Sequence, residues 1–263
     1  MKNLLFNGCS FVAGDDLGWD YANGQPSDSP KLWDIHKENR KSWNLSALCA
    51  LELNTSVVDL SIDGNSNCNI SFKTIDYIQK LTVEEKNNLH VCIGWTEPYR
   101  FLHFIEYKKT FDTIHPISMH VDKESTWFKN DHWVKLFSYI SEYTQSIVKY
   151  KKDIDSFLPY LSEVLLLENF LIANNITYTF WRSMGFRITN TDQKFLNELI
   201  DTNNISNSKS WINFDSADLY CPVWLGTSWR DIGEPVSISF HPTEESVIKQ
   251  KDRICTNIKN QLF

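Results

Sequence analysis

The sequence has no apolar run long enough to cross a membrane, and its overall charge is not basic. The longest apolar candidate, 164–172, is interrupted by Glu168 and Asn169, whereas a spanning helix needs about 20 apolar residues. The formal net charge is -7, and a general nucleic-acid binder normally carries a basic face. We therefore expect neither a membrane partner nor a nucleic-acid partner.

Cysteine and histidine spacings typical of metal sites are also absent. The 6 cysteines are dispersed and form no C-x-x-C pair. The spacing of His115, His120 and Asp122 matches no standard metal site. The amino-terminal segment does not read as a signal peptide. We expect reduced, mostly buried cysteines in a cytoplasmic protein, or in a virion if a phage encodes it, with no metal and no cofactor.

What the sequence does contain is an alternation of short apolar strands and amphipathic helices. Over the first 95 residues, this pattern predicts strands at 4–7, 57–62 and 90–95, with helices at 43–53 and 69–81. Such alternation is typical of a parallel α/β sheet. Further elements are a strand at 176–181 and helices at 131–150, 154–173, 191–200 and 243–260. We expect one domain, 1–263, with an irregular insertion or lid at about 99–155.

The three predicted strands end in small and polar residues. These are Gly8-Cys9-Ser10, Gly64-Asn65 and the segment 94–97. Because the carboxyl ends of parallel strands share one edge, where ligands bind, we expect these segments to converge. Ser10 is then a candidate nucleophile, which needs a base, a group that orients the base, and oxyanion donors. The competing interpretation is that Ser10 is only a turn or cap residue. Cys9 is a second candidate nucleophile, but on an extended strand end its side chain points opposite to that of Ser10, so we expect Cys9 to be buried.

The order of these segments resembles that of the SGNH, or GDSL-like, hydrolases. In that family a serine follows strand one, a glycine follows strand two, Gly-x-Asn-Asp follows strand three, and Asp-x-x-His-Pro lies near the carboxyl terminus. The matching blocks here are 7–11, 64–67, 94–97 and His241-Pro242. The Gly-Cys-Ser-Phe form of the first block is similar to variants in phage and environmental relatives. The resemblance implies a three-layer αβα sandwich with a mostly parallel, flavodoxin-like sheet.

The resemblance also implies roles for individual residues. Ser10 becomes the nucleophile, and His241 becomes the general base and then the general acid. The implied oxyanion hole consists of Ser10, Gly64, Asn65, Asn67 and Thr96. Thr96 occupies the position of the family's asparagine, and Ile238 occupies that of the aspartate before the histidine. Asp231 and Glu234 are the nearby carboxylates that can replace that aspartate in orienting the imidazole.

The implied substrate is an ester, such as an O-acyl group on a carbohydrate or another small ester. The chain has 10 tryptophans, and aromatic rings of this kind stack on sugars or fill cores. Trp95, Glu97 and Arg100 follow the third strand closely and are candidate substrate contacts. Trp95 can equally belong to the core, and Arg100 can equally pair with Glu97.

Two other functions stay open at this point. The altered third block and Ile238 are consistent with a non-catalytic binding or structural protein on the same fold, such as a virion component. Gly8 and Gly14 also permit a nucleotide- or phosphate-handling protein. Their spacing, however, matches neither G-x-G-x-x-G nor the Walker pattern.

Overall fold

The computed structural model describes residues 2–14, 38, 41–98, 100–105, 110–114, 153–183, 210–212 and 244–262. Within this part of the chain, a four-stranded parallel sheet has the order β2-β1-β3-β6. The strands are β1 Asn3–Gly8, β2 Val57–Asp59, β3 Leu89–Trp95 and β6 Thr177–Arg182. Beyond β6, Trp211 forms a parallel bridge to Phe180. The expected parallel α/β sheet is confirmed.

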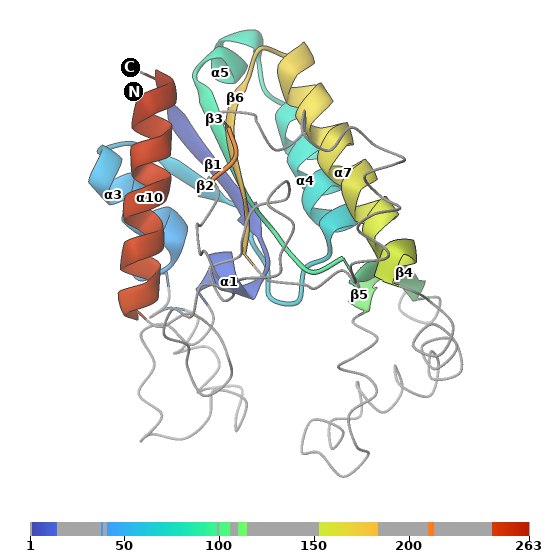
Figure 1. Ribbon diagram of the computed structural model, residues 1–263. Coiled ribbons are helices and arrows are strands. Elements are labelled where there is room, and N and C mark those ends of the chain that lie inside the picture. Colours follow the sequence, from blue (N-terminus) through green and yellow to red (C-terminus); the bar gives the residue numbers. More distant parts are fainter. Residues whose placement is uncertain are drawn as a thin grey trace.

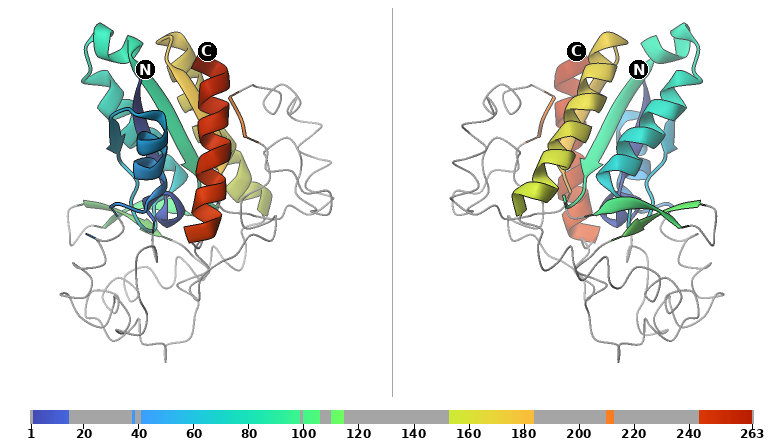
Figure 2. Two further views of the ribbon diagram at one scale, coloured as in Figure 1. Left: turned by 90° about the vertical axis from the view of Figure 1, so that its left-hand side faces the viewer. Right: turned by 90° about the vertical axis from the view of Figure 1, so that its right-hand side faces the viewer.

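Helices cover both faces of this sheet, as Figure 1 shows. One face is covered by α3, Leu45–Leu53, and α10, Glu244–Leu262. The other is covered by α4, Asn67–Gln79, and α7, Asp153–Ala173. The result is a three-layer αβα arrangement. Both chain termini lie at the amino end of β1 (Figure 2).

The strands divide their side chains between two hydrophobic cores. Leu5 and Phe180 pack with residues of α4 and α7, whereas Leu4 and Phe6 pack with residues of α3 and α10. This division follows from the two-residue period of a strand, which sends successive side chains to opposite faces. Every residue of β3 is buried, as expected for a central strand covered by helices on both sides.

Capping residues explain where several helices begin and end. The side chains of Asn44 and Ser66 accept hydrogen bonds from the first turns of α3 and α4. The helix α5, Val83–Asn87, begins with a capping box in which Thr82 and Glu85 bond reciprocally. Asn54 ends α3 with a left-handed backbone, at a φ of 47°. The predicted end of this helix at Asn54 is confirmed.

The structure corrects the expectation of an irregular segment directly after β3. Residues Phe101–Ile105 and Thr110–Ile114 form the antiparallel hairpin β4–β5. The short helices α1, Ser10–Ala13, and α5 were also not predicted. The expected helices at 131–150 and 191–200, and the remainder of the 99–155 insertion, lie outside the described residues.

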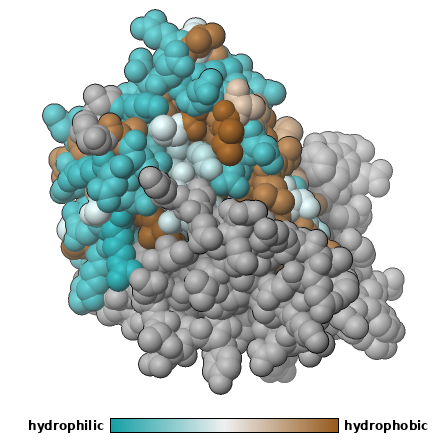
Figure 3. Space-filling model, turned by 45° about the horizontal axis from the view of Figure 1, so that its top comes forward, coloured by the Kyte–Doolittle hydropathy of each residue, from teal (hydrophilic) through white to brown (hydrophobic). Residues whose placement is uncertain are grey.

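Apolar side chains on the described surface are mixed with hydrophilic ones on the face drawn in Figure 3. The most exposed are Leu51 of α3, Val83 of α5 and Phe72 of α4. Among the described helices, none is both long enough and apolar enough to span a membrane.

Candidate active site

Ser10 is the first residue of α1, directly after the central strand β1. Ser10 is buried, with 5% of its surface exposed. The preceding Cys9 is the helix N-cap, and the left-handed Gly14 ends the helix by donating its N–H to the Ser10 carbonyl. In the strand order β2-β1-β3-β6, chain connections leave β1 and β3 in opposite directions. Ligands of such sheets bind at this switch point, beyond the carboxyl ends of the strands.

Val12 fixes the position of α1 over the ends of β1 and β3. A Cβ atom added at Gly8 would lie 2.4 Å from Val12 Cγ2, and one added at Gly94 would lie 2.5 Å from it. Val12 itself is fully buried. The two glycines therefore leave the space in which α1, and with it Ser10, sits. This packing accounts for Gly8 without a phosphate-binding role.

The loop after β2 is tied to the end of β1 by Asn65. Gly64 has a φ of 71°, the left-handed region that favours glycine. The Asn65 amide donates to the Gly8 carbonyl at 3.0 Å and to Asn7 Oδ1 at 3.5 Å. Asn7 in turn donates to the carbonyl of Ile70 in α4. Asn7 is a site residue that sequence reasoning missed, although a polar residue at the end of an apolar strand was a usable signal.

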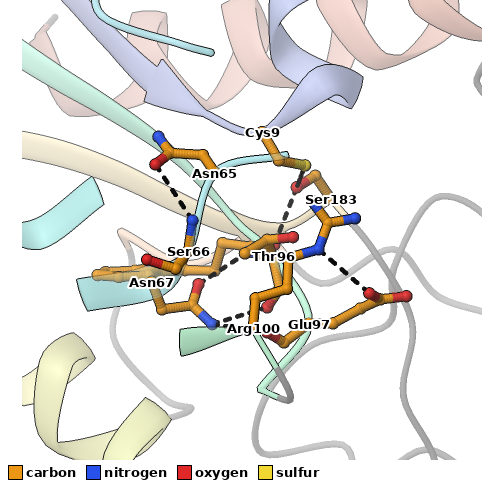
Figure 4. Close-up of polar contacts among 9 residues, drawn as sticks. Cys9, Asn65, Ser66, Asn67, Thr96, Glu97, Arg100 and Ser183 are labelled. Carbon is orange, nitrogen blue, oxygen red and sulfur yellow. Dashed lines mark hydrogen bonds and ion pairs between the residues drawn. The ribbon is translucent and has the colours of Figure 1, made fainter. Parts of the chain in front are cut away.

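The first residue of α4, Asn67, is tied to the end of β3. Its Nδ2 donates to the carbonyls of Thr96 and Glu97, both at 3.1 Å, and its Oδ1 accepts from the Thr96 N–H at 2.9 Å. Asn67 and Thr96 are buried. The segments that follow β1, β2 and β3 therefore converge at one edge, as predicted, and Figure 4 shows the contacts of Asn67 with Thr96 and Glu97 there.

The end of β6 joins the same edge through Ser183, which sequence reasoning also missed. Both its backbone N–H and its Oγ donate to the Trp95 carbonyl at 2.9 Å. Its Oγ also lies 3.6 Å from Cys9 Sγ (Figure 4). Cys9 is fully buried, which confirms the expectation of packing. Strand alternation does not explain this burial, because Cys9 occupies the N-cap position of α1 and lies beyond the end of β1.

The candidate substrate residues have different environments. Glu97 and Arg100 form an ion pair at 3.3 Å, with side chains 16% and 10% exposed. The alternative interpretation, in which Arg100 pairs with Glu97, is thus the observed one. Trp95 is fully buried and packs edge-on against Tyr160 and Phe180. Of the two interpretations given for Trp95, substrate contact and core, the structure shows the core one.

The partners expected near the carboxyl terminus lie outside the described residues. These are His241, Ile238, Asp231 and Glu234. The described chain resumes at α10, three residues after His241. Because α10 ends beside the amino terminus, it begins at the end of the sheet where α1 lies (Figure 1). Val247, in its first turn, packs in the same core as Val12.

A substitution at Gly94 tests whether Val12 holds α1 in place. Gly94→Ala is expected to lower the free energy of unfolding by about 1–3 kcal/mol, because the added methyl group overpacks against Val12 and Trp181. Val12→Ala in the same chain removes the nearest clashing atom and should recover part of this loss. Denaturant unfolding of the two single variants and the double variant measures the coupling. Strictly additive losses would contradict the proposed contact.

Comparison with known proteins gives weak structural matches. No protein-family model and no curated protein matches the chain. One similar solved structure is that of a carbohydrate esterase whose active site displays divergent catalytic and non-catalytic binding functions. The match has a TM-score of 0.45 and 10% sequence identity, and it covers 98% of this chain and 68% of the esterase chain. A second is a family two carbohydrate esterase from Clostridium thermocellum in complex with cellohexaose. That match has a TM-score of 0.46 and 13% sequence identity, and it covers 99% of this chain and 64% of the esterase chain.

An active-site mutant of a family two carbohydrate esterase from the same organism gives a TM-score of 0.46 at 12% identity, over 99% of this chain and 64% of that one. The chain thus spans just under two thirds of the length of the two Clostridium structures. These similarities are too weak to transfer a function, so the proposed function rests on the residues of this chain.

Proposed function

We propose that the protein is an SGNH-like serine hydrolase that cleaves an ester, with Ser10 as the nucleophile. The observation that carries the proposal is the placement of Ser10. It follows the central strand at the switch point of the sheet, and the segments after β2, β3 and β6 are hydrogen-bonded around it. A nucleophile held by rigid elements at such an edge is positioned for attack on a carbonyl.

In the proposed reaction, Ser10 Oγ attacks the ester carbonyl while His241 accepts the hydroxyl proton. The tetrahedral oxyanion then collapses, the alcohol leaves with a proton from His241, and water hydrolyses the acyl-enzyme by the same route. The backbone N–H groups of Ser10 and Gly64, with the Thr96 hydroxyl, are the proposed oxyanion donors. The order of sequence blocks and the abundance of tryptophan favour an O-acyl group on a carbohydrate as the substrate.

Ser10→Ala tests this proposal. It is expected to lower kcat for the hydrolysis of an activated acetate ester and of an O-acetylated oligosaccharide by about 10⁴-fold or more. Ser61→Ala is the matched control, because Ser61 lies in the loop after β2 and is not a proposed catalytic group. Hydrolysis that survives in Ser10→Ala at the wild-type rate would contradict the proposal.

A non-catalytic binding protein is the second candidate, and one specific observation favours it. Both N–H groups of the Asn65 amide and both of the Asn67 amide point at other groups of the protein, so neither amide is directed at a bound carbonyl. Ile238 also replaces the family's aspartate. If the protein only binds its ligand, calorimetry should detect binding of an acylated oligosaccharide without turnover. The affinity should then be equal in wild type and Ser10→Ala.

A further inference from the structure

The Asn67 side chain pairs with Thr96 as the backbone of a neighbouring strand would. Its Oδ1 accepts the Thr96 N–H at 2.9 Å, and its Nδ2 donates to the Thr96 carbonyl at 3.1 Å. The strand β3 ends at Trp95. Asn67 therefore continues the hydrogen-bonding pattern one residue beyond the strand, from the first position of α4.

A second contact of Asn67 extends this hold to the following turn. Its Nδ2 also donates to the Glu97 carbonyl at 3.1 Å. The same carbonyl accepts the Arg100 N–H at 3.4 Å, and the Arg100 Nε bonds to the Glu97 carboxylate at 3.3 Å. One side chain, 3% exposed, thus anchors the backbone from Thr96 to the ion pair that closes the turn (Figure 4).

These contacts occupy the amide nitrogen of Asn67, which has two N–H donors, with two backbone carbonyls. An oxyanion donor must direct an N–H or O–H at the reacting carbonyl. Asn67 can do so only by releasing the buried carbonyl of Thr96 or the part-buried carbonyl of Glu97 from this donor. The Asn67 side chain is therefore placed to hold the backbone of Thr96, not to bind a ligand.

We propose that Asn67 is a positioning residue that holds Thr96 so that the Thr96 hydroxyl, in place of the family's asparagine amide, donates to the oxyanion. The catalytic part of this inference rests on the proposed hydrolase function. The structural part, the hold of Asn67 on the end of β3, does not.

The test of the hold is Asn67→Asp, which preserves the shape of the side chain. At about pH 8 the carboxylate lacks both donors and faces two carbonyl oxygens, so the unfolding midpoint in urea should fall below that of wild type. At about pH 4 a protonated carboxyl regains one donor, and the difference from wild type at the same pH should shrink. Asn87→Asp, at an exposed position in α5, makes the same charge change and should follow wild type. A midpoint of Asn67→Asp equal to that of wild type at both pH values would overturn the hold.

The test of the catalytic part compares Asn67→Asp, Thr96→Val and the double variant in ester hydrolysis. Each single variant should lower kcat by about 10²-fold with KM little changed. The double variant should be no slower than Asn67→Asp, because both changes remove the same donor. Losses that multiply, or an unchanged kcat in Thr96→Val, would overturn the assignment. Wild-type protein without any hydrolysis would refute the proposed function, and the urea experiment would still decide whether Asn67 holds the end of β3.

Discussion

Acidification from pH 6.5 to pH 3 is expected to lower the free energy of unfolding by about 4 kcal/mol through His90 alone. Burial of the imidazole and, as the smaller cause, the nearby charge of Lys2 together lower the pKa of His90 from 6.5 to about 3. In this window the unfolded chain binds a proton at His90 and the folded chain does not. Stability therefore rises with pH, is fully present above pH 6.5, and is lost as the pH falls toward 3.

The hydrogen bonds around His90 explain why the neutral ring is held. Lys2 donates to Thr177 Oγ1 at 3.2 Å, which leaves the Thr177 hydroxyl proton for His90 Nδ1 at 2.8 Å. The Thr179 hydroxyl donates to Asn257 at 2.9 Å, so its oxygen accepts from His90 Nε2 at 3.0 Å. One ring nitrogen accepts and the other donates, which is the arrangement of a neutral imidazole. A second ring proton would oppose the Thr177 hydroxyl and lie near Lys2.

Denaturant unfolding, followed by tryptophan fluorescence at several pH values between 3 and 7, measures this effect. His90→Gln provides the comparison, since glutamine does not titrate. The pH slope of wild type should exceed that of His90→Gln by about 1.4 kcal/mol per pH unit between pH 4 and pH 6. Equal slopes would show that His90 is not held in the neutral form.

His241→Ala is expected to lower the kcat of ester hydrolysis by about 10³-fold or more, because the Ser10 hydroxyl loses the base that accepts its proton. Folding should be unaffected at this position if the role is catalytic, so the far-UV spectrum and urea midpoint should match those of wild type. A His241→Ala variant with wild-type kcat would exclude the Ser–His mechanism.

The group that orients His241 can be found in the same assay. Asp231→Asn and Glu234→Gln remove the two carboxylates nearest to the histidine in sequence. If one of them orients the imidazole, its variant should lose a large part of kcat while the other stays close to wild type. Wild-type rates in both variants would indicate a Ser–His pair that works without either carboxylate.

Elements with a clear apolar pattern were predictable from the sequence. The continuous apolar runs of β1 and β3 reflect burial on both faces of the sheet, and the helical spacing of apolar residues in α7 reflects burial against the sheet. The two-residue period of a strand also indicated where Trp95 lies. It stands two residues after Ile93 and therefore faces the same α4–α7 core.

Other elements left only weak or overlooked signals. The helix α1 has four residues and is separated from β1 by Cys9 alone. Such a helix is too short to show a hydrophobic period. The sequence Thr82-x-x-Glu85 is a capping box, and this pattern does predict the start of α5. The hairpin β4–β5 is rich in aromatic and β-branched residues, which are typical of strands. The expectation of an irregular insertion at about 99–155 did not use this signal.

The candidate site was predictable as a meeting of strand ends, but not in its contacts. Parallel topology alone brings Ser10, Gly64 and Thr96 to one edge. Whether an asparagine there binds a ligand or the backbone depends on partners far away in sequence. Asn67 and Thr96 are 29 residues apart, and Cys9 and Ser183 are 174 apart. No local pattern specifies such pairs.

The most direct test of the central claim is to locate the adduct of a fluorophosphonate probe on the folded wild-type protein by peptide mass mapping. An activated serine forms a covalent phosphonate ester, whereas an ordinary hydroxyl does not react. We expect a single adduct on Ser10, with no labelling in Ser10→Ala. Folded protein that remains unlabelled, or an adduct on another residue that persists in Ser10→Ala, would contradict the assignment of Ser10 as the nucleophile.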